Sequence, residues 1–492
     1  MLIKKLLKLN EKKGRIFLFL LVTAFAFGYV LVSVLRHLRF ESLAYDLGIY
    51  DQAIWLFSRF QVPFSTIKNT HLFGDHLIPV LAILGPLYWL TDDALALLVF
   101  QVIWVVAGAI PVYMLAKERL KSVFLSLVLA FAYLSFFGIQ NGVIFDFHPL
   151  LLAVPLIAWW FYFFEKNNKV YLLISLLLLG FQENLGLLVL ALGVMAALKR
   201  ETRKEGLIIV SVGFIWFLLA TKIFIPHFAQ NESFSYFPKA VSLKPQIFLQ
   251  EFFYPFEKIK TILISLGAIG FLPVFYPPIL IPLAEQFAER FVGNMAATRW
   301  GIGLHYSAPL APILLYGTIK VLEKKFFQKK GTFLLSIGIF LLMLSLFYQF
   351  FLHLPLNLLS KKEFYRLPEW HQDLGKVSLL IGENDSLATQ NNLLPHFSHR
   401  EKIYLFSSCA EVPNPSRGMF CQPLVDQDSQ ELPLIEKEKT KFILVNFHPR
   451  QNPNNFFPDG EESLKKYGDK LLLDKKYKIR FKEGEIILLE RI

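Results

Sequence analysis

Three long stretches without a charged side chain constrain the fold of this 492-residue chain more than any other feature. They are residues 16–35, 94–116 and 331–352. A helix rises about 1.5 Å per residue, so each stretch spans the roughly 30 Å hydrocarbon core of a bilayer. Because lipid offers no partners to backbone N–H and C=O groups, such stretches must be helical there. The sequence therefore predicts an α-helical polytopic membrane protein.

The net charge of +12 is concentrated in short loops instead of being spread over a soluble surface. Residues 355–492 contain 20 basic and 20 acidic side chains, whereas five loops contain 20 basic and 6 acidic ones. This is the positive-inside pattern of cytoplasmic loops, and it does not indicate a nucleic-acid partner. The five loops are residues 4–15, 117–121, 165–169, 199–205 and 320–330.

Placing all five basic loops on the cytoplasmic side predicts about 11 crossings of the inner (cytoplasmic) membrane. The N-terminus is then cytoplasmic, residues 16–35 are an uncleaved first helix, and the C-terminus is extracytoplasmic. Gln182, Glu183 and Asn184 interrupt residues 170–198, which predicts two short helices that meet at a polar turn. The predicted crossings are residues 16–35, 94–116, 122–138, 149–164, two within 170–198, 207–225, 262–275, 277–291, 306–322 and 331–352.

The remaining sequence predicts a long first outer loop and a soluble domain. Residues 36–93 form the loop, and its apolar stretch 77–90 is too short to span and is expected to lie at the membrane surface. We assign residues 1–354 to the membrane domain and 355–492 to a small extracytoplasmic α/β domain. Four segments of this domain read as strands or hairpins: residues 376–382, 402–407, 441–447 and 476–492.

The soluble domain also holds the only cysteines and two histidines. Cys409 and Cys421 are compatible with either a disulfide or two free thiols, because their geometry is not given by sequence. His396 and His399 are expected on the domain surface.

Ionisable residues that interrupt apolar sequence gather on the predicted outer side. Burying such groups near lipid is costly, so their default interpretation is functional. Residues 45–76 carry several of them directly after the first helix. The set is Asp46, Asp51, His71, Asp75, His76, Asp146, His148, Glu183, Arg299, His305 and Tyr306.

Each residue also has a structural interpretation. Asp51 could cap an interfacial helix, and Asp146 and His148 flank a helix start at Pro149. Glu183 could satisfy the broken-helix turn. His71 and His76 are five residues apart, which does not place both on one helical face as a metalloprotease motif requires. A metal requirement is therefore left unknown, with a divalent cation as the one candidate cofactor.

Several motifs together resemble an uncharacterised family of predicted bacterial and archaeal membrane proteins, domain of unknown function 2079. They are YDLGIYDQAIW, GDHLIPVLAILGPLYWL, FDFHP, QEN, LHYSAPLAP and LLPHFSHREKIYLF, between about residue 45 and the end of the chain. The family commonly has Lys-Glu-Asp where this chain has Gln182, Glu183 and Asn184. This chain therefore retains the glutamate, as Glu183, but lacks the lysine and aspartate that could form a charge pair at this turn.

That family is in turn similar to the GT-C class of membrane glycosyltransferases. The similarity implies a GT-C-like fold, maps the two acidic positions of the class to Asp46 and Asp146, and implies a polyprenyl-phosphate-linked sugar donor in the lipid bilayer. It rests on architecture, and fold analogy alone does not establish activity.

The resemblance implies a division of labour among these residues. Asp46 would be the general base, and Asp146 and Glu183 would be further catalytic residues. Arg299 or His305 would stabilise the departing phosphate. The other substrate contacts would be Asp51, His71, His76, His148 and Tyr306.

Two other functions fit the same sequence. A transporter or lipid-handling protein would line a translocation path with these charges, but it should place them near the membrane midplane. A non-catalytic assembly or sensor protein would use its outer domain to bind a partner, and no protein partner can be named. No P-loop, GxGxxG, HExxH or GxSxG motif supports a soluble-enzyme chemistry.

Overall fold

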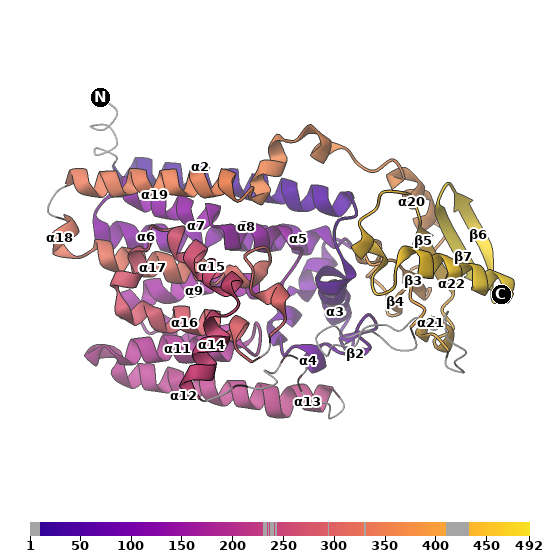
Figure 1. Cartoon of the computed structure of the whole chain (residues 1–492), viewed down its shortest axis with the longest axis horizontal. Coiled ribbons are helices and arrows are strands. Elements are labelled where there is room, and N and C mark those ends of the chain that lie inside the picture. Colours follow the sequence, from indigo (N-terminus) through magenta and orange to yellow (C-terminus); the bar gives the residue numbers. More distant parts are fainter. Residues whose placement is uncertain are drawn as a thin grey trace.

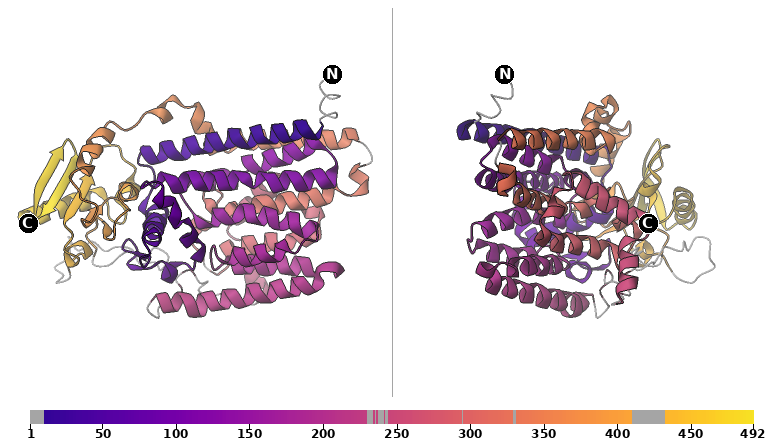
Figure 2. Two further views of the ribbon diagram at one scale, coloured as in Figure 1. Left: turned by 180° about the vertical axis from the view of Figure 1, so that it is seen from behind. Right: turned by 60° about the vertical axis from the view of Figure 1, so that its left-hand side comes forward.

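The computed structural model of the chain is a bundle of roughly parallel helices with a small sheet at one end (Figure 1). It describes residues 10–229, 234, 236, 241, 244–293, 295–328, 331–409 and 432–492. Seen from behind, the sheet and the N-terminal end of α2 again lie at opposite ends of the bundle (Figure 2). The helices are α2 (Glu11–Leu38), α3 (Ile49–Ser58), α4 (Leu72–Asp75), α5 (Leu95–Ala107), α6 (Ala109–Leu120), α7 (Val123–Ser135), α8 (Phe137–Ile144), α9 (Pro149–Glu165), α10 (Val170–Leu179), α11 (Leu185–Ala197), α12 (Arg203–Leu219), α13 (Ile225–Phe228), α14 (Pro245–Phe253), α15 (Phe256–Gly267), α16 (Leu280–Phe291), α17 (Leu310–Leu322), α18 (Lys325–Gln328), α19 (Gly331–Phe351), α20 (His371–Ser378), α21 (Leu434–Lys437) and α22 (Glu461–Leu473).

Several helices are long and apolar enough to cross a membrane. Within the described residues there are five. They cover Glu11–Leu38, Leu95–Leu120, Val123–Ile144, Arg200–Phe228 and Thr332–Phe351. Helices α9, α10 and α11 are apolar but shorter, so the count of 11 crossings stays a prediction.

The shorter helices can be compared with the crossings predicted from the sequence. α10 and α11 meet at the Gln182–Asn184 turn, which confirms the broken pair predicted for residues 170–198. The helix predicted over 262–275 ends instead at Gly267. Gly270 and Phe271 take positive φ angles of 61° and 58°, a left-handed conformation that a helix cannot continue through.

The basic loops lie together at the end of the bundle away from the sheet. Glu165, whose side chain is 3% exposed, pairs with Arg119, Lys199 and Lys320 at 2.6, 2.7 and 3.2 Å. Glu11 pairs with Lys117 at 2.9 Å and ties the first basic loop to the second. The five loops therefore share one end, as predicted, although the compartment that they face stays a prediction.

The C-terminal part folds around a five-stranded sheet in the order β4-β3-β5-β7-β6. β3 (Leu387–Thr389), β4 (Ile403–Leu405) and β5 (Phe442–Asn446) are parallel. β7 (Ile486–Arg491) runs antiparallel to both β5 and β6 (Tyr477–Glu483). This confirms a small sheet here and the hairpin predicted for 476–492, while the division of the chain at residue 355 stays a prediction.

One predicted strand is wrong. Most of residues 376–382 lie in α20 and the turn after it, because Leu374 and Val377 are buried at helical spacing while Leu379 is 87% exposed. The interior strand β3, which carries no long apolar run, was not predicted.

The first loop, now defined as residues 39–94 between α2 and α5, packs between the bundle and the sheet. It contains α3, α4, a two-stranded ribbon of β1 (Phe64–Ser65) and β2 (Thr70–His71), and a 3₁₀ helix over Pro79–Trp89. That helix coincides with the short apolar segment of residues 77–90, whose predicted position at the membrane surface stays a prediction. His396 and His399 are not on the domain surface as expected: His396 is partly buried and stacks on His37, with ring centroids 4.0 Å apart, and the His399 side chain is only 12% exposed. Cys421 lies outside the described residues, so its pairing with Cys409 stays untested.

Candidate functional site

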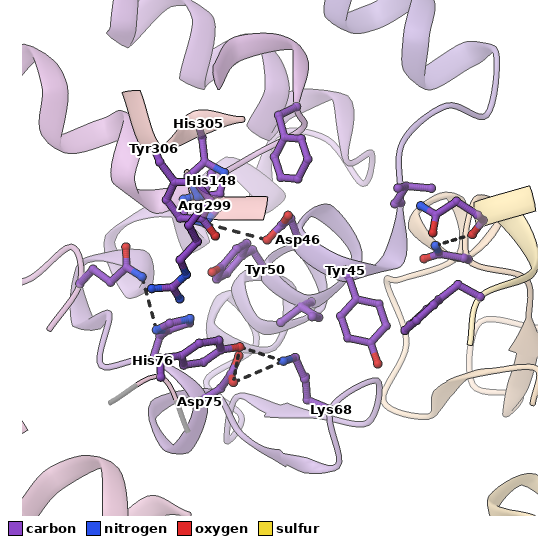
Figure 3. A pocket seen from close by; sticks show the side chains of 18 residues that line it. Tyr45, Asp46, Tyr50, Lys68, Asp75, His76, His148, Arg299, His305 and Tyr306 are labelled. Atoms are coloured by element: carbon purple, nitrogen blue, oxygen red, sulfur yellow. Dashed lines mark hydrogen bonds and ion pairs between the residues drawn. The ribbon is translucent and has the colours of Figure 1, made fainter. Parts of the chain in front are cut away.

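A cavity of about 360 Å³ opens at the sheet end of the bundle, within the size range of small-molecule sites. Side chains from the first loop, the helix termini and the C-terminal part converge on it (Figure 3). Six of the residues to which the resemblance assigns a role line it: Asp46, His76, His148, Arg299, His305 and Tyr306. The other lining residues are Leu43, Tyr45, Ile49, Tyr50, Lys68, Asp75, Phe145, Gln182, Tyr236, Asn391, Asn454 and Phe457.

Asp46 stands in a turn between α2 and α3 with an unusual backbone. Its φ and ψ angles of 95° and −84° belong to a region that residues with a Cβ rarely adopt. Such strain concentrates at functional sites, where surrounding contacts hold it in place. The Asp46 side chain is 24% exposed and points into the cavity (Figure 3). Burial, reinforced by the nearby Asp146 carboxylate, raises the pKa of Asp46 to about 7.

Two stacked histidines face Asp46. His148 and His305 have ring centroids 3.5 Å apart, and His148 Nε2 lies 3.9 Å from Asp46 Oδ1. The backbone N–H of Leu150 donates to His148 Nδ1, which caps α9. A neutral His148 must therefore carry its proton on Nε2, the atom nearest Asp46. Burial lowers the pKa of both histidines well below the usual value.

Arg299 brings a positive charge to the same cavity. Its guanidinium lies 5.5 Å from the ring centres of both Tyr236 and Tyr306. No carboxylate within the described part of the chain forms an ion pair with it. Arg299 is thus free to meet an anionic ligand, and the flanking rings add cation–π attraction.

A residue that the sequence analysis missed holds the Arg299 loop. Arg290 is 1% exposed and donates to the carbonyl oxygens of Arg299 and Gly301 at 2.9 and 2.6 Å. It also donates to Ser307 Oγ at 3.2 Å. A charged residue near the end of the apolar run 277–291 was the available signal.

Lys68, Asp75 and Tyr236 form a second polar group on the cavity wall. Lys68 Nζ lies 3.4 Å from Asp75 Oδ1 and 3.1 Å from the Tyr236 hydroxyl. Burial opposes the charge of both Asp75 and Lys68. Even so, Lys68 lowers the pKa of Asp75, and Asp75 raises the pKa of Lys68. Lys68 and Tyr236 were not predicted, because nothing local in their sequences separates them from ordinary loop residues.

Glu183 and Asp146 lie behind the cavity and support residues that line it. Glu183 Oε1 accepts a hydrogen bond from His76 Nδ1 at 2.8 Å, and its Oε2 accepts from the Leu77 N–H at 3.1 Å. Asp146 Oδ2 accepts from the Leu43 N–H at 2.9 Å, three residues before Asp46. Both are placed to orient other groups and not to touch a ligand in this cavity.

Asp51 and His71 point elsewhere. Asp51 is fully buried and pairs with His399 Nε2 at 3.1 Å. His71 accepts from the Phe73 N–H at 3.0 Å, capping α4, and its ring stacks on Phe228. The substrate-contact roles expected for these two residues have no support from their positions.

A second, mostly apolar cavity of about 210 Å³ adjoins the first. The two share His76, Gln182, Tyr236, Arg299 and Tyr306. The second continues along apolar side chains such as Leu150, Leu187 and Phe217. A ligand with a polar head and an apolar tail would fit across both.

The donor set offers little to a metal ion. Within the described residues, no group of three or more His, Cys, Asp or Glu side chains has the arrangement of a metal site. Asp46 and His148 alone give too few ligands, so a divalent cation stays an untested expectation.

Comparison with known protein families identifies the family to which the chain belongs. A family model described as a predicted membrane protein (DUF2079) matches residues 36–448. That range contains every cavity residue except Asn454 and Phe457. No curated protein matches the chain.

Proposed function

The chain belongs to this family of predicted membrane proteins, and on that premise we propose that it is a GT-C-like glycosyltransferase using a polyprenyl-phosphate-linked sugar. The observation that carries the proposal is one cavity holding both a cation, Arg299, that forms an ion pair with no carboxylate of the described residues, and a strained carboxylate, Asp46, whose pKa burial raises to about 7. A general base works best when its pKa lies near the working pH. Transfer would take place at the extracytoplasmic face of the cytoplasmic membrane.

The proposed reaction displaces a phosphate from the anomeric carbon. Asp46 accepts the proton of the acceptor hydroxyl while that oxygen forms a bond to the carbon. The bond from the carbon to the phosphate oxygen breaks, and the phosphate leaves with the electron pair. Arg299 stabilises the charge that develops on the leaving oxygen. Attack from the opposite face inverts the anomeric configuration.

The supporting residues keep these two groups in place. Asp146 orients the backbone that leads to Asp46, and Glu183 orients His76. His148 and His305, both neutral, offer hydrogen bonds to the sugar or the acceptor. The adjoining apolar cavity supports a lipid-linked donor, because it offers the first isoprene units a place beside Arg299.

The experiment is a transfer assay with purified protein in lipid nanodiscs. Radiolabelled polyprenyl-phosphate sugars are supplied with candidate glycan and lipid acceptors, and the product is separated by chromatography. The proposal predicts a covalently glycosylated product and release of the polyprenyl phosphate. Asp469→Asn, an exposed change on α22, is the matched control and should transfer normally.

A transporter gives a different result in the same preparation. Reconstituted vesicles that move labelled lipid or sugar across the bilayer without forming a product would overturn the proposal. The two outcomes are separated by whether a new glycosidic bond is detected.

A further inference from the structure

The C-terminal part contributes Asn391, Asn454 and Phe457 to the cavity, and Asn391 belongs to residues 390–403, which we call the interface segment. The Ala44 N–H donates to the carbonyl oxygen of Asn391 at 2.8 Å, and Asn391 itself lines the cavity. Gln52 Nε2 donates to the carbonyl oxygen of Arg400 at 3.2 Å. The interface segment thus lies against both the turn that carries Asp46 and the helix α3 that follows it.

His399 places its ring between two carboxylates of the first loop. Its Nε2 lies 3.1 Å from Asp51 Oδ2 on α3, and its Nδ1 lies 2.8 Å from Asp92 Oδ1. The Nδ1–Asp92 contact is a hydrogen bond, whereas the Nε2–Asp51 contact is an ion pair by distance without hydrogen-bond geometry. An imidazole ring held between two carboxylates is stabilised in its charged imidazolium form.

The surroundings of His399 favour that charge. The Trp55 ring stacks at 6.0 Å and the Tyr88 ring packs edge-on at 4.4 Å. The hydroxyls of Tyr88 and Ser398 donate to Asp51.

The other charged groups nearby do not offset the attraction between the carboxylates and a positively charged His399. Arg59 is 3.6 Å from Asp92, and the Arg400 guanidinium is turned away to the carbonyl oxygens of Gly382 and Asp385. Asp93 and Glu383 line the adjoining cavity of about 490 Å³, and add negative charge. His37 and His396 line that cavity as well.

We propose that His399 is a positioning residue that clasps the interface segment to α3 as an imidazolium, and that the cavity loses its C-terminal wall when this proton is lost. The clasp itself does not rest on the proposed function, whereas its effect on transfer does. Although burial opposes the charge, Asp51 and Asp92 raise the pKa of His399. The stabilisation that the charged His399 ring gives to this interface is therefore complete below the free histidine pKa of about 6.5. It is lost as pH rises through the raised pKa of His399.

Hydrogen–deuterium exchange on the full-length protein in nanodiscs tests the clasp. Peptides covering 44–58 and 390–403 are compared at pH 6 and pH 9 after correction for intrinsic exchange rates. We expect protection to fall at pH 9, because the neutral ring no longer attracts the carboxylates of Asp51 and Asp92. Peptides from α22 should not change.

Two substitutions at His399 keep the test decisive. His399→Gln should lower protection at pH 6 and remove its pH dependence, whereas His399→Lys should restore protection at both pH values because its charge persists to about pH 10. His353→Gln, an exposed histidine after α19, is the control and should keep the wild-type profile. Wild-type protection that is equal at the two pH values, or pH dependence that survives in His399→Gln, would overturn the proposal whatever the transfer assay shows.

Discussion

The pKa of Asp46 gives the account its sharpest prediction at the scale of single residues. If Asp46 is the base, kcat/KM for transfer should rise with pH and reach half its maximum near pH 7, because only the carboxylate accepts a proton. Asp146→Asn keeps an acceptor for the Leu43 N–H but removes a negative charge. The pH–rate midpoint should then move to lower pH, and a midpoint that stays fixed would show that Asp146 does not act on Asp46.

Two neighbouring arginines should separate ligand binding from stability. Arg299→Gln should weaken binding of polyprenyl phosphate about tenfold or more with little change in melting temperature, because its charge faces the cavity. Arg290→Gln leaves buried carbonyl oxygens without donors and should cost about 2–4 kcal/mol of stability. Calorimetric titration measures the binding of polyprenyl phosphate, and thermal unfolding in the same detergent measures stability. Equal effects of the two substitutions on binding and stability would contradict the assignment.

Some of the helices and strands could be predicted from sequence patterns, and others could not. The Gln182–Asn184 turn and the hairpin were predictable because polar or turn residues interrupt strong apolar patterns. α20 was mistaken for a strand because its short apolar run hides a helical burial period at Leu374 and Val377. Lys68 and Tyr236 were missed because their roles arise from tertiary contacts alone, whereas Arg290 was missed although its charge near the end of an apolar run could have pointed to it.

Packing of α11 against α12 gives a prediction at this scale. A Cβ at Gly213 would lie 2.6 Å from the carbonyl oxygen of Gly186, closer than any neighbour can tolerate without moving. Small residues of this kind let membrane helices approach closely. Gly213→Ala should therefore lower stability by about 1–3 kcal/mol in thermal unfolding. Gly468→Ala on α22, where a Cβ meets nothing within 4 Å, should be neutral or stabilising, and a similar loss there would remove the packing explanation.

At the scale of the whole molecule, the basic end and the sheet end should face opposite compartments. The ion pairs of Glu165 and Glu11 collect the basic loops at one end, and the sheet lies at the other (Figure 1). The cavity opens at the sheet end. A reporter enzyme that is active only outside the cytoplasm should be active when fused after Ile492 and inactive when fused after Lys121. Activity at both positions, or the reverse pattern, would contradict the predicted orientation.

The central claim is that Asp46 performs chemistry in the cavity. Single-turnover transfer by wild-type protein and Asp46→Asn, measured at pH 8 with donor binding followed in parallel, tests it most directly. The account predicts a loss of at least about 100-fold in the rate of transfer with donor binding retained, because the amide cannot accept the proton. Transfer by Asp46→Asn at the wild-type rate would contradict it.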